Sequence, residues 1–539
     1  ASTDHKQIGI TQVTAAFTFF LLGGALAILM RTELAQPGLQ VLSEDGYNQA
    51  FTIHGSTMFY LFASPVAIGI GIYMVPLQIG APGLVWPRAA LLGMWLFICG
   101  GIAMWSGFAT ESGAASFGWT AFYPLSDTSS SPGIGGDLWI AGVVLAGVGV
   151  LIGAVCLLAT VIRRRPPDMT LLRMPLFTWS EVVTTLMVIT SYPVLLAAMT
   201  ILYLQRHGAD ILDTAGGPIT YQHLFWFWGH PVVYVVFFPL VGAVGEVIAT
   251  FSRRRFFGFR VTVLSLLAFS AISMSVWGHH MFTTQAVSNN YFSLTSTALA
   301  VPAGIEYFGF LATMVGGRIH LRAPMLFAIG FVLLFLIGGL TGIFVASPPL
   351  DYQVHDSYFV VAHFHYTLFG GTVFGMFAAL YYWLPKATGR LLGERLARIH
   401  FGLMFAGALL AFIPMFFLGE EGMPRRVADY LPHRDWGTLN MLSSIGAYLI
   451  AASILVFLVN LVRSLRGGTR VGPDPWQGQT LEWATESPPP PHNFDALPPI
   501  RSFAPLLDLR ERGEDPATVV GLPGSPDDPT GPPSGEGLR

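Results

Sequence analysis

Twelve long apolar runs dominate this sequence, and they constrain its fold more than any other feature. The hydrocarbon core of a bilayer is about 30 Å thick, so a spanning helix needs roughly twenty apolar residues. Each run meets that length, and we therefore expect an all-α integral membrane protein of about twelve transmembrane helices. The runs cover approximately residues 8–30, 52–78, 89–110, 137–162, 176–204, 222–251, 261–286, 292–317, 325–346, 358–385, 399–419 and 440–465.

The overall composition also favours a bilayer as the solvent. Of the 539 residues, 53% are hydrophobic and only 11% are charged, whereas roughly 25% of residues are charged in soluble proteins. No sustained basic patch occurs outside short loops, so we expect no nucleic-acid partner. Cys99 and Cys156 each lie inside an apolar run, and we expect them only to pack.

Basic residues between the runs predict how the chain is oriented. They follow the even-numbered runs, and all these exits fall on one side of the membrane. The positive-inside rule makes this side cytoplasmic, so both termini are expected in the cytoplasm of a bacterial cell, with the chain crossing its plasma membrane many times. The basic residues are Arg163, Arg164, Arg165, Arg173, Arg253, Arg254, Arg255, Arg260, Arg318, Arg322, Lys386, Arg390, Arg395, Arg398, Arg463, Arg466 and Arg470.

A change of composition near residue 467 divides the chain. Residues 1–466 are expected to form one transmembrane domain. Residues 467–539 are rich in Pro, Gly, Asp and Ser, including the run Pro488 to Pro491. Such a composition is typical of an extended or disordered segment, so we expect a cytoplasmic tail that is largely extended or disordered.

The histidines inside the apolar runs are the most informative polar residues. Ionisable side chains at bilayer depth are costly and are usually functional. A lone helix histidine is more often a hydrogen-bonded packing residue, but six in adjacent or alternating positions favour metal binding, because neutral imidazole is a common ligand of iron and copper. The six are His54, His230, His279, His280, His363 and His365.

The spacing of these histidines suggests how they could divide between metals. Two residues along a helix correspond to a rotation of about 200°, so His363 and His365 can serve two different metals on opposite faces. The adjacent pair His279 and His280 could bind one metal if the helix opens locally, with His230 as a third ligand. Tyr234, four residues after His230, lies on the same helix face. It could supply a proton and an electron, or form an ordinary aromatic pair.

Several longer strings resemble subunit I of the haem–copper oxygen reductases, in particular its mitochondrial-type branch. The resemblance extends from about residue 8 to 495 and keeps the order and spacing of the family's motifs. The strings are Met30-Arg31-Thr-Glu-Leu, Trp228-Gly-His230-Pro-Val-Val-Tyr234, Trp277-Gly-His279-His280-Met-Phe-Thr-Thr, His355-Asp356-Ser-Tyr-Phe-Val-Val-Ala-His363-Phe-His365, Met423-Pro-Arg425-Arg426 and Asp474-Pro-Trp-Gln-Gly-Gln-Thr-Leu-Glu-Trp483.

The resemblance implies two haems of a or b type, one low-spin and one high-spin, and one copper ion, CuB. The axial ligands of the low-spin haem would be His54 and His365, and the proximal ligand of the high-spin haem would be His363. The copper would be held by three further residues, which are His230, His279 and His280.

Further roles follow from the same resemblance. Tyr234 would be the tyrosine joined covalently to His230, and it would supply the last reducing equivalent for cleavage of the oxygen–oxygen bond. Other polar residues would support the haems. Arg425 and Arg426 would hold haem propionates, His355 and Asp356 a magnesium or manganese ion, Arg31 a substituent of the low-spin haem, and Glu33 could touch a structural cation.

The implied activity is that of a terminal oxidase in aerobic respiration. Electrons would pass from the low-spin haem to the haem–copper pair, where dioxygen is reduced to water. Quinol-using relatives carry an Arg and an Asp on the first helix, where this chain has Leu22 and Leu26. This favours cytochrome c as the donor, acting through a subunit II that carries CuA, with a subunit III as further partner.

The sequence departs from the family where protons are normally taken up. In the family's two proton channels, Val232 and Gly83 occupy positions that are usually acidic. Ile72 occupies an asparagine position, and Glu306 occupies a lysine position. Since protons cross an apolar core only along polar groups or ordered water, we expect pumping to be weak or rerouted. Glu306 is our candidate for a replacement path, although it could equally be a buried acid that is protonated or paired.

Two other classes of protein share part of this pattern. Nitric oxide reductases of the same superfamily do not pump and often lack these channels, but they use iron in place of copper. Tyr234 and three copper-type histidines favour oxygen as the substrate. A channel or transporter would account for twelve spans but not for the paired histidines.

Overall fold

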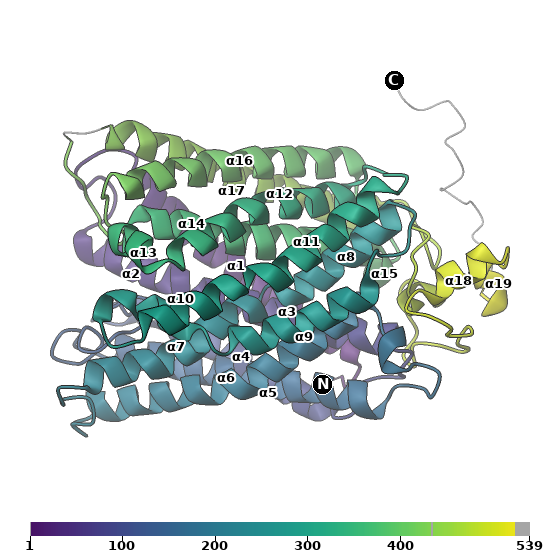
Figure 1. The fold of residues 1–539 in the computed structure, drawn as a ribbon, viewed down its shortest axis with the longest axis horizontal. Helices are drawn as coiled ribbons and strands as arrows, with labels where there is room; N and C mark the ends of the chain where they lie inside the picture. The colour runs from purple at the N-terminus through teal and green to yellow at the C-terminus, as the bar shows by residue number, and fades with distance from the viewer. Residues whose placement is uncertain (1, 433–434, 523–539) are drawn as a thin grey trace.

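The computed structural model describes residues 2–432 and 435–522, and in them twelve helical spans run roughly parallel (Figure 1). Each span coincides with one of the predicted apolar runs, so the prediction of an all-α membrane protein is confirmed. The described residues contain no β-strand. The spans are His5–Glu33, Glu44–Gln78, Pro87–Ala109, Gly135–Arg163, Leu176–Arg206, Gly217–Phe251, Phe259–Thr284, Asn289–Val315, Ala323–Val345, Tyr358–Thr388, Glu394–Glu420 and Trp436–Gly467.

Six of the spans are single α-helices. They are α1 (His5–Glu33), α5 (Gly135–Arg163), α6 (Leu176–Arg206), α12 (Ala323–Val345), α16 (Glu394–Glu420) and α17 (Trp436–Gly467). The others are broken into shorter pieces. These pieces are α2 (Glu44–Ser56), η1 (Thr57–Ala63) and α3 (Ser64–Gln78); α4 (Pro87–Ser106) and η2 (Gly107–Ala109); α7 (Gly217–Val235) and α8 (Phe238–Phe251); α9 (Phe259–Ser273) and η4 (Trp277–Thr284); α10 (Asn289–Ala298) and α11 (Ala300–Val315); α14 (Tyr358–Leu368), η5 (Phe369–Val373) and α15 (Phe374–Thr388).

Three of the broken spans depart from α-helical geometry next to intramembrane histidines. The π-helical turn η1 begins three residues after His54, and the π-helical turn η5 begins four residues after His365. The segment η4, which contains His279 and His280, is a 3₁₀ helix separated from α9 by a short break. Local departures from α-helical geometry often mark functional sites. Here they provide the local opening that the adjacent pair requires to reach one metal.

Small residues allow the helices to approach closely in the apolar layer. An added Cβ on Gly100 of α4 would come within 2.7 Å of the carbonyl oxygen of Gly142 on α5. The reverse substitution on Gly142 would bring its Cβ within 2.8 Å of the carbonyl oxygen of Gly100. Because lipid tails are as apolar as the helix surfaces, such close packing is a main source of helix association in membranes.

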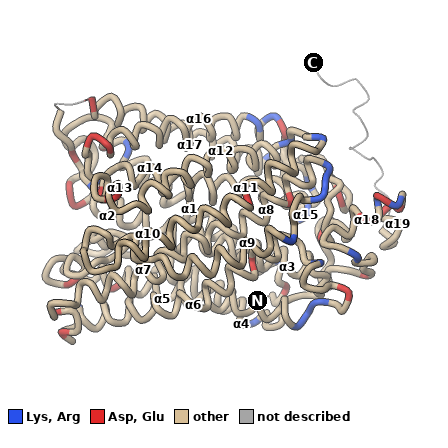
Figure 2. The backbone as a smooth tube through the Cα atoms, viewed as in Figure 1, with Lys and Arg blue, Asp and Glu red and all other residues tan. Residues whose placement is uncertain are grey.

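Charges are distributed unequally between the two ends of the bundle. Most Lys and Arg side chains lie at the end near α18 (Pro505–Glu511) and α19 (Pro516–Val519), whereas acidic residues predominate at the opposite end (Figure 2). The cytoplasmic location of the basic end, which the positive-inside rule indicates, stays a prediction.

The segment after residue 467 makes defined contacts with the bundle in its described part. Up to residue 522 it has little helix, but it packs against the basic end of the bundle. The Lys386 ammonium donates to the carbonyl oxygens of Pro473 and Thr485 at 2.8 and 2.6 Å, and the Trp483 indole donates to the Tyr382 hydroxyl at 2.9 Å. A few buried aromatic and polar side chains thus hold this segment against the bundle, although it is rich in Pro and Gly. Residues 523–539 of the predicted tail lie outside the described part.

Candidate metal centre

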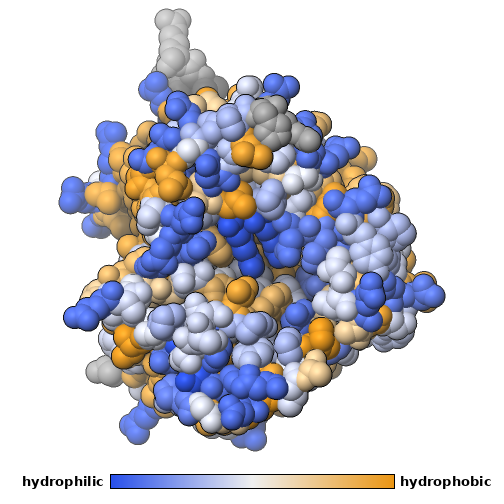
Figure 3. Space-filling view, turned by 90° about the vertical axis from the view of Figure 1, so that its left-hand side faces the viewer, coloured by the Kyte–Doolittle hydropathy of each residue, from blue (hydrophilic) through white to orange (hydrophobic). Residues whose placement is uncertain are grey.

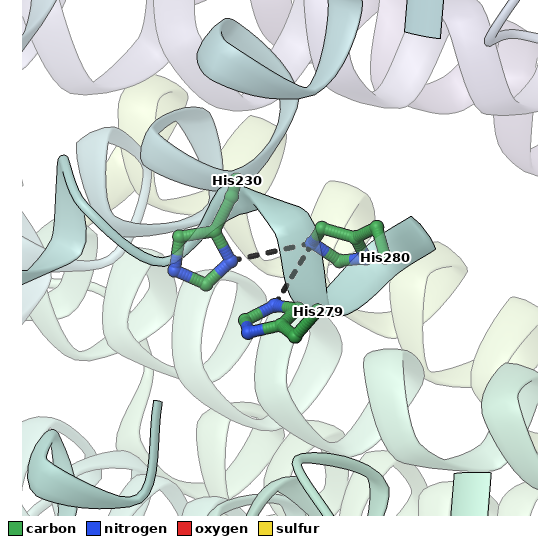
Figure 4. Close-up of side chains that lie close together, drawn as sticks. All are labelled: His230, His279 and His280. Atoms are coloured by element: carbon green, nitrogen blue, oxygen red, sulfur yellow. Dashed lines mark hydrogen bonds between the residues drawn. The ribbon is translucent and has the colours of Figure 1, made fainter. Parts of the chain in front are cut away.

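Three histidines from two spans converge on one point inside the bundle. Their ligand atoms all lie within 4.8 Å of one another, and within the described residues no other group of three His, Cys, Asp or Glu side chains does so. His280 Nε2 lies 3.3 Å from His230 Nδ1 and 3.1 Å from His279 Nε2 (Figure 4). Three nitrogens bound to one ion at about 2.0 Å in a trigonal arrangement would be roughly 3.5 Å apart. The three rings are therefore close to a metal-binding geometry.

Neighbouring side chains fix the orientation of this trio. The Ser296 hydroxyl lies 2.7 Å from His279 Nδ1, which leaves Nε2 of that ring directed at the other two histidines. The His280 ring stacks on the Trp226 indole with a centroid distance of 3.9 Å and an interplanar angle of 13°. Partners of this kind set ring orientation and raise the basicity of metal-ligating histidines.

Tyr234 lies beside the trio, one helical turn after His230 on α7. The centroids of the two rings are 4.8 Å apart with an interplanar angle of 61°. Tyr234 also lines the same cavity as the three histidines. A phenol at this position can deliver a proton to a ligand that is bound at the trio.

His363 faces the trio across a cavity of about 540 Å³, a volume within the usual range for cofactor sites. Its Nδ1 lies 3.1 Å from both the Gly338 carbonyl oxygen and the Thr341 hydroxyl on α12. Since Nδ1 donates to the carbonyl, the lone pair is on Nε2. A Cβ added to Gly342 would come within 3.1 Å of the His363 ring, so the absence of a side chain there leaves room for the imidazole.

His54 and His365 lie outside that cavity lining and are held in the same way as each other. The Nδ1 of His54 donates to the carbonyl oxygen of Gly23 on α1 at 2.8 Å. The Nδ1 of His365 donates to the carbonyl oxygen of Val361 at 2.8 Å, and its ring stacks on Phe412 of α16. Both histidines therefore present Nε2 as a ligand atom, which suits the two axial positions of one haem iron.

Three arginines near these histidines have buried donor atoms that no described side chain or carbonyl accepts. Arg31 donates through Nη2 to the carbonyl oxygen of Asn440 at 2.7 Å, but its Nε and Nη1 have no partner among the described residues. The same holds for Arg425 Nε and Arg426 Nη2. Burial and the neighbouring Arg425 lower the pKa of Arg426 to about 10. These unpaired donors fit anionic or carbonyl substituents of a bound ring.

The predicted magnesium or manganese pair lies at the acidic end, where the surface is hydrophilic and hollowed near its centre (Figure 3). His355 Nδ1 is 3.3 Å from an oxygen of Asp351, and Asp356 forms an ion pair with Arg425. Burial lowers the pKa of His355, but Asp351 and Asp356 outweigh it and produce a net increase. Arg425 and His355 overcome burial to lower the pKa of Asp356. These residues form an ion-paired cluster in the described structure, and a metal there stays a prediction.

Two acidic residues with predicted roles, Glu306 and Glu33, lie in surroundings that differ from those of the histidine trio. Glu306 is 3% exposed on the buried face of α11 but does not line the histidine cavity, and its Oε1 has no partner among the described residues. Glu33 accepts hydrogen bonds from the backbone N–H groups of Gln40, Val41 and Leu42 at 2.6 to 2.7 Å. The carboxylate of Glu33 therefore orders this loop, and the suggested contact with a cation stays a prediction.

Several residues of the site were missed in the sequence. Ser296 and Thr341 orient His279 and His363 from other spans, and Asp351 lies one turn before His355. Only Asp351 had a sequence signal, because an acid four residues from a histidine shares its helix face. The two hydroxyls look like ordinary polar residues in apolar runs.

Comparisons with known proteins identify the group to which this arrangement belongs. Residues 7–449 match the family described as cytochrome c and quinol oxidase polypeptide I. The chain belongs to this family. The expected resemblance to the haem–copper oxidases is thereby confirmed, and this family implies haem and copper cofactors.

Individual relatives agree with the family match. A putative cytochrome c oxidase subunit 1-beta of Streptomyces coelicolor is 51% identical over 94% of this chain and 89% of its own length. A cytochrome c oxidase subunit 1 of Corynebacterium efficiens is 48% identical over 94% of this chain and 88% of its own length. A solved haem–copper terminal oxidase dimer has the same fold, with a TM-score of 0.71 at 19% identity, covering 86% of this chain and 84% of that one. The chain is accordingly the core subunit of a terminal oxidase, an oxidoreductase.

Proposed function

We propose that this subunit I accepts electrons from cytochrome c and uses them to reduce dioxygen to water at a haem–copper pair. In this proposal His54 and His365 hold a low-spin haem, and His363 holds the high-spin haem. Copper is bound by His230, His279 and His280. The observation that carries the proposal is the convergence of this trio opposite His363 in one cavity of about 540 Å³.

The residues of the chain suit these groups in three respects. Each of His54, His363 and His365 uses Nδ1 as a donor to a backbone carbonyl, so that Nε2 is available for iron. Arg425 and Arg426 have buried donors without partners among the described residues, which fit two propionates. The cavity lining is mostly apolar and aromatic, as expected for a haem pocket.

The chain contributes positioning and proton chemistry to the reaction. Haem iron and copper supply electron transfer and oxygen binding when they are present. The Ser296 hydroxyl and the Trp226 ring keep two histidines of the trio in place, so little reorganisation is needed during turnover. The Tyr234 hydroxyl is the nearest phenolic proton source to His230 in the cavity. A covalent link between these two rings is part of the proposal.

The donor and the partner subunits are inferred from the same family pattern. Leu22 and Leu26 replace the polar residues that quinol-using relatives carry on the first helix, which supports cytochrome c as the donor. A subunit II with CuA would deliver the electrons, and a subunit III would complete the core. The proposal places the basic end and both termini in the cytoplasm of a bacterial cell, with His355 and Asp356 near a magnesium or manganese ion on the outer side.

Purification of the oxidase complex from membranes allows a direct test. The proposal expects an optical spectrum with two haems, copper in the complex, and oxygen consumption driven by reduced cytochrome c. Nitric oxide supplied under anaerobic conditions serves as the competing substrate. Consumption of nitric oxide without oxygen consumption, in a preparation that lacks copper, would contradict the proposal and identify a nitric oxide reductase.

A further inference from the structure

A second buried acid lies in the membrane on α6, away from the histidine cavity. Glu181 is only 1% exposed, and neither of its carboxyl oxygens has a hydrogen-bond partner among the described residues. A Cβ added to Gly71 on α3 would come within 2.7 Å of this carboxyl group. A buried carboxylate without a partner is very costly. The Glu181 carboxyl group therefore carries a proton or is hydrogen-bonded to internal water.

The face of α6 that carries Glu181 holds two groups of polar side chains, separated by the buried Val188. Thr184 and Thr185 lie one turn further, and Ser191 and Tyr192 lie about three turns further; all four are at most 2% exposed. The Thr184 hydroxyl and the neighbouring Ser180 hydroxyl also have no partner among the described residues. Buried hydroxyls without protein partners are usually satisfied by internal water. This stripe can therefore support a chain of hydroxyls and waters over part of the apolar layer, with waters spanning the turn at Val188.

The end of the stripe at Tyr192 reaches α7, the helix that carries His230 of the trio. The Tyr192 ring contacts the Trp228 indole edge-on, with a centroid distance of 5.8 Å. Trp228 precedes His230 by two residues on α7. At a rise of about 1.5 Å per residue, Tyr192 lies roughly 16 Å along α6 from Glu181. The polar stripe thus covers about half of the bilayer core.

The other end of the stripe, near Glu181, connects to a polar cluster at the basic end of the bundle. The Gln78 amide donates to Glu246 at 2.7 Å and to Glu482 at 3.2 Å, and its carbonyl oxygen accepts from the Thr178 hydroxyl at 2.9 Å. Thr178 precedes Glu181 by three residues, so the two side chains are neighbours on α6. A cavity of about 20 Å³ that Glu246 lines has room for one water molecule.

We propose that Glu181 is a proton relay residue in a path that begins at Glu246, passes Gln78 and Thr178, and continues along α6 to Tyr192. In each cycle the Glu181 carboxyl gives its proton to the hydroxyl and water chain above it and regains one from the Glu246 side, with no net change. The inference rests on the proposed function. On α7 the family's acidic position is occupied by Val232, which is fully buried and cannot carry a proton. The inference gives this task to Glu181 on α6.

Isosteric substitution tests this role. Glu181→Gln keeps the shape of the side chain but cannot exchange a proton, whereas Glu181→Asp keeps the carboxyl group. Thr190→Val is the control on the same helix, because Thr190 is exposed on the outer face and bonds only within α6 and to Met274. The readouts are oxygen consumption, proton uptake by the complex in liposomes, the haem spectrum, and the infrared C=O stretch of protonated carboxylic acids.

The inference expects Glu181→Gln to slow turnover and proton uptake at least tenfold with an unchanged haem spectrum, and to remove one carboxylic acid band. Glu181→Asp should retain a measurable part of the rate, and Thr190→Val should behave as the wild type. Unchanged turnover and proton uptake in Glu181→Gln would overturn the inference. A wild-type complex without haem or oxygen consumption would instead contradict the proposed function, so the two failures are distinguishable.

Discussion

His363 and His365, two residues apart on α14, face different helices. The Nδ1 of His363 donates to the Gly338 carbonyl on α12 at 3.1 Å, while the ring of His365 stacks on Phe412 of α16 at 4.7 Å. One short helical segment can therefore hold two redox centres in fixed relation, because neither ring can move without breaking its contact. In the proposed function, a fixed arrangement of this kind would favour rapid electron transfer between the two haems.

Replacement of each of these histidines should remove a different haem. His363→Ala should lose the spectral features of the high-spin haem and keep those of the low-spin haem, and His365→Ala should do the reverse. Both variants should lose oxygen consumption almost completely. Optical and paramagnetic resonance spectra of the purified variants check this assignment. The same haem lost in both variants would show that the two rings serve one centre.

The hydroxyl of Ser296 should contribute more to copper affinity than the hydroxyl of its neighbour Thr295 on α10. Ser296→Ala removes the partner of His279 Nδ1, and loss of such a partner typically lowers metal affinity by about 10–100-fold. Thr295→Ala is the control, since Thr295 bonds only to carbonyl groups of its own helix. Copper retention during dialysis against a chelator measures the difference. Equal retention in the two variants would argue against an orienting role for Ser296.

Glu306 should contribute to proton supply if the sequence-based hypothesis holds. Glu306→Gln is then expected to slow oxygen consumption several-fold without altering the haem spectrum, because the amide cannot exchange a proton. Stopped-flow measurement of proton uptake provides an independent readout. Unchanged turnover in this variant would exclude Glu306 from any proton path.

The packed segment after residue 467 should stabilise the basic end of the bundle. Lys386→Met leaves buried carbonyl oxygens of that segment without a donor, which costs about 1–3 kcal/mol. Thermal denaturation and limited proteolysis near residue 480 should reveal the loss. Arg398→Ala, which breaks an exposed ion pair with Glu394, should cost about 0–1 kcal/mol. Resistance of Lys386→Met to protease equal to that of the wild type would contradict the proposed contact.

The His355 cluster predicts a pH dependence of stability. The pKa of His355 is raised in the folded chain, because Asp351 and Asp356 outweigh burial. Its contribution to stability is therefore fully present below the unfolded pKa of about 6.5 and is lost as the pH rises through the higher folded value. His355→Gln should remove this part of the pH dependence. Thermal unfolding measured across neutral pH checks it, and an identical pH profile in the variant would refute it.

The sequence predicted the fold and singled out the three histidines that the structure brings together, but it did not predict the side chains that orient them. The twelve spans could be recognised because apolar runs of this length have few other stable solutions, and buried histidines stand out in such runs. Ser296 could not be assigned to His279, since their contact depends on how η4 and α10 pack. Glu181 was overlooked because one acid near the end of a run looks like a residue at the membrane surface. Composition alone could not show that the segment after 467 packs against the bundle, because this packing depends on a few side chains such as Trp483.

The central claim is that the trio of His230, His279 and His280 holds copper opposite a haem on His363. Metal analysis of the purified complex together with its optical spectrum, for the wild type and for His279→Ala, tests this claim most directly. We predict that His279→Ala loses one copper ion per complex and oxygen consumption while it keeps the spectra of both haems. An unchanged copper content in that variant, or a wild-type complex without haem, would contradict the account.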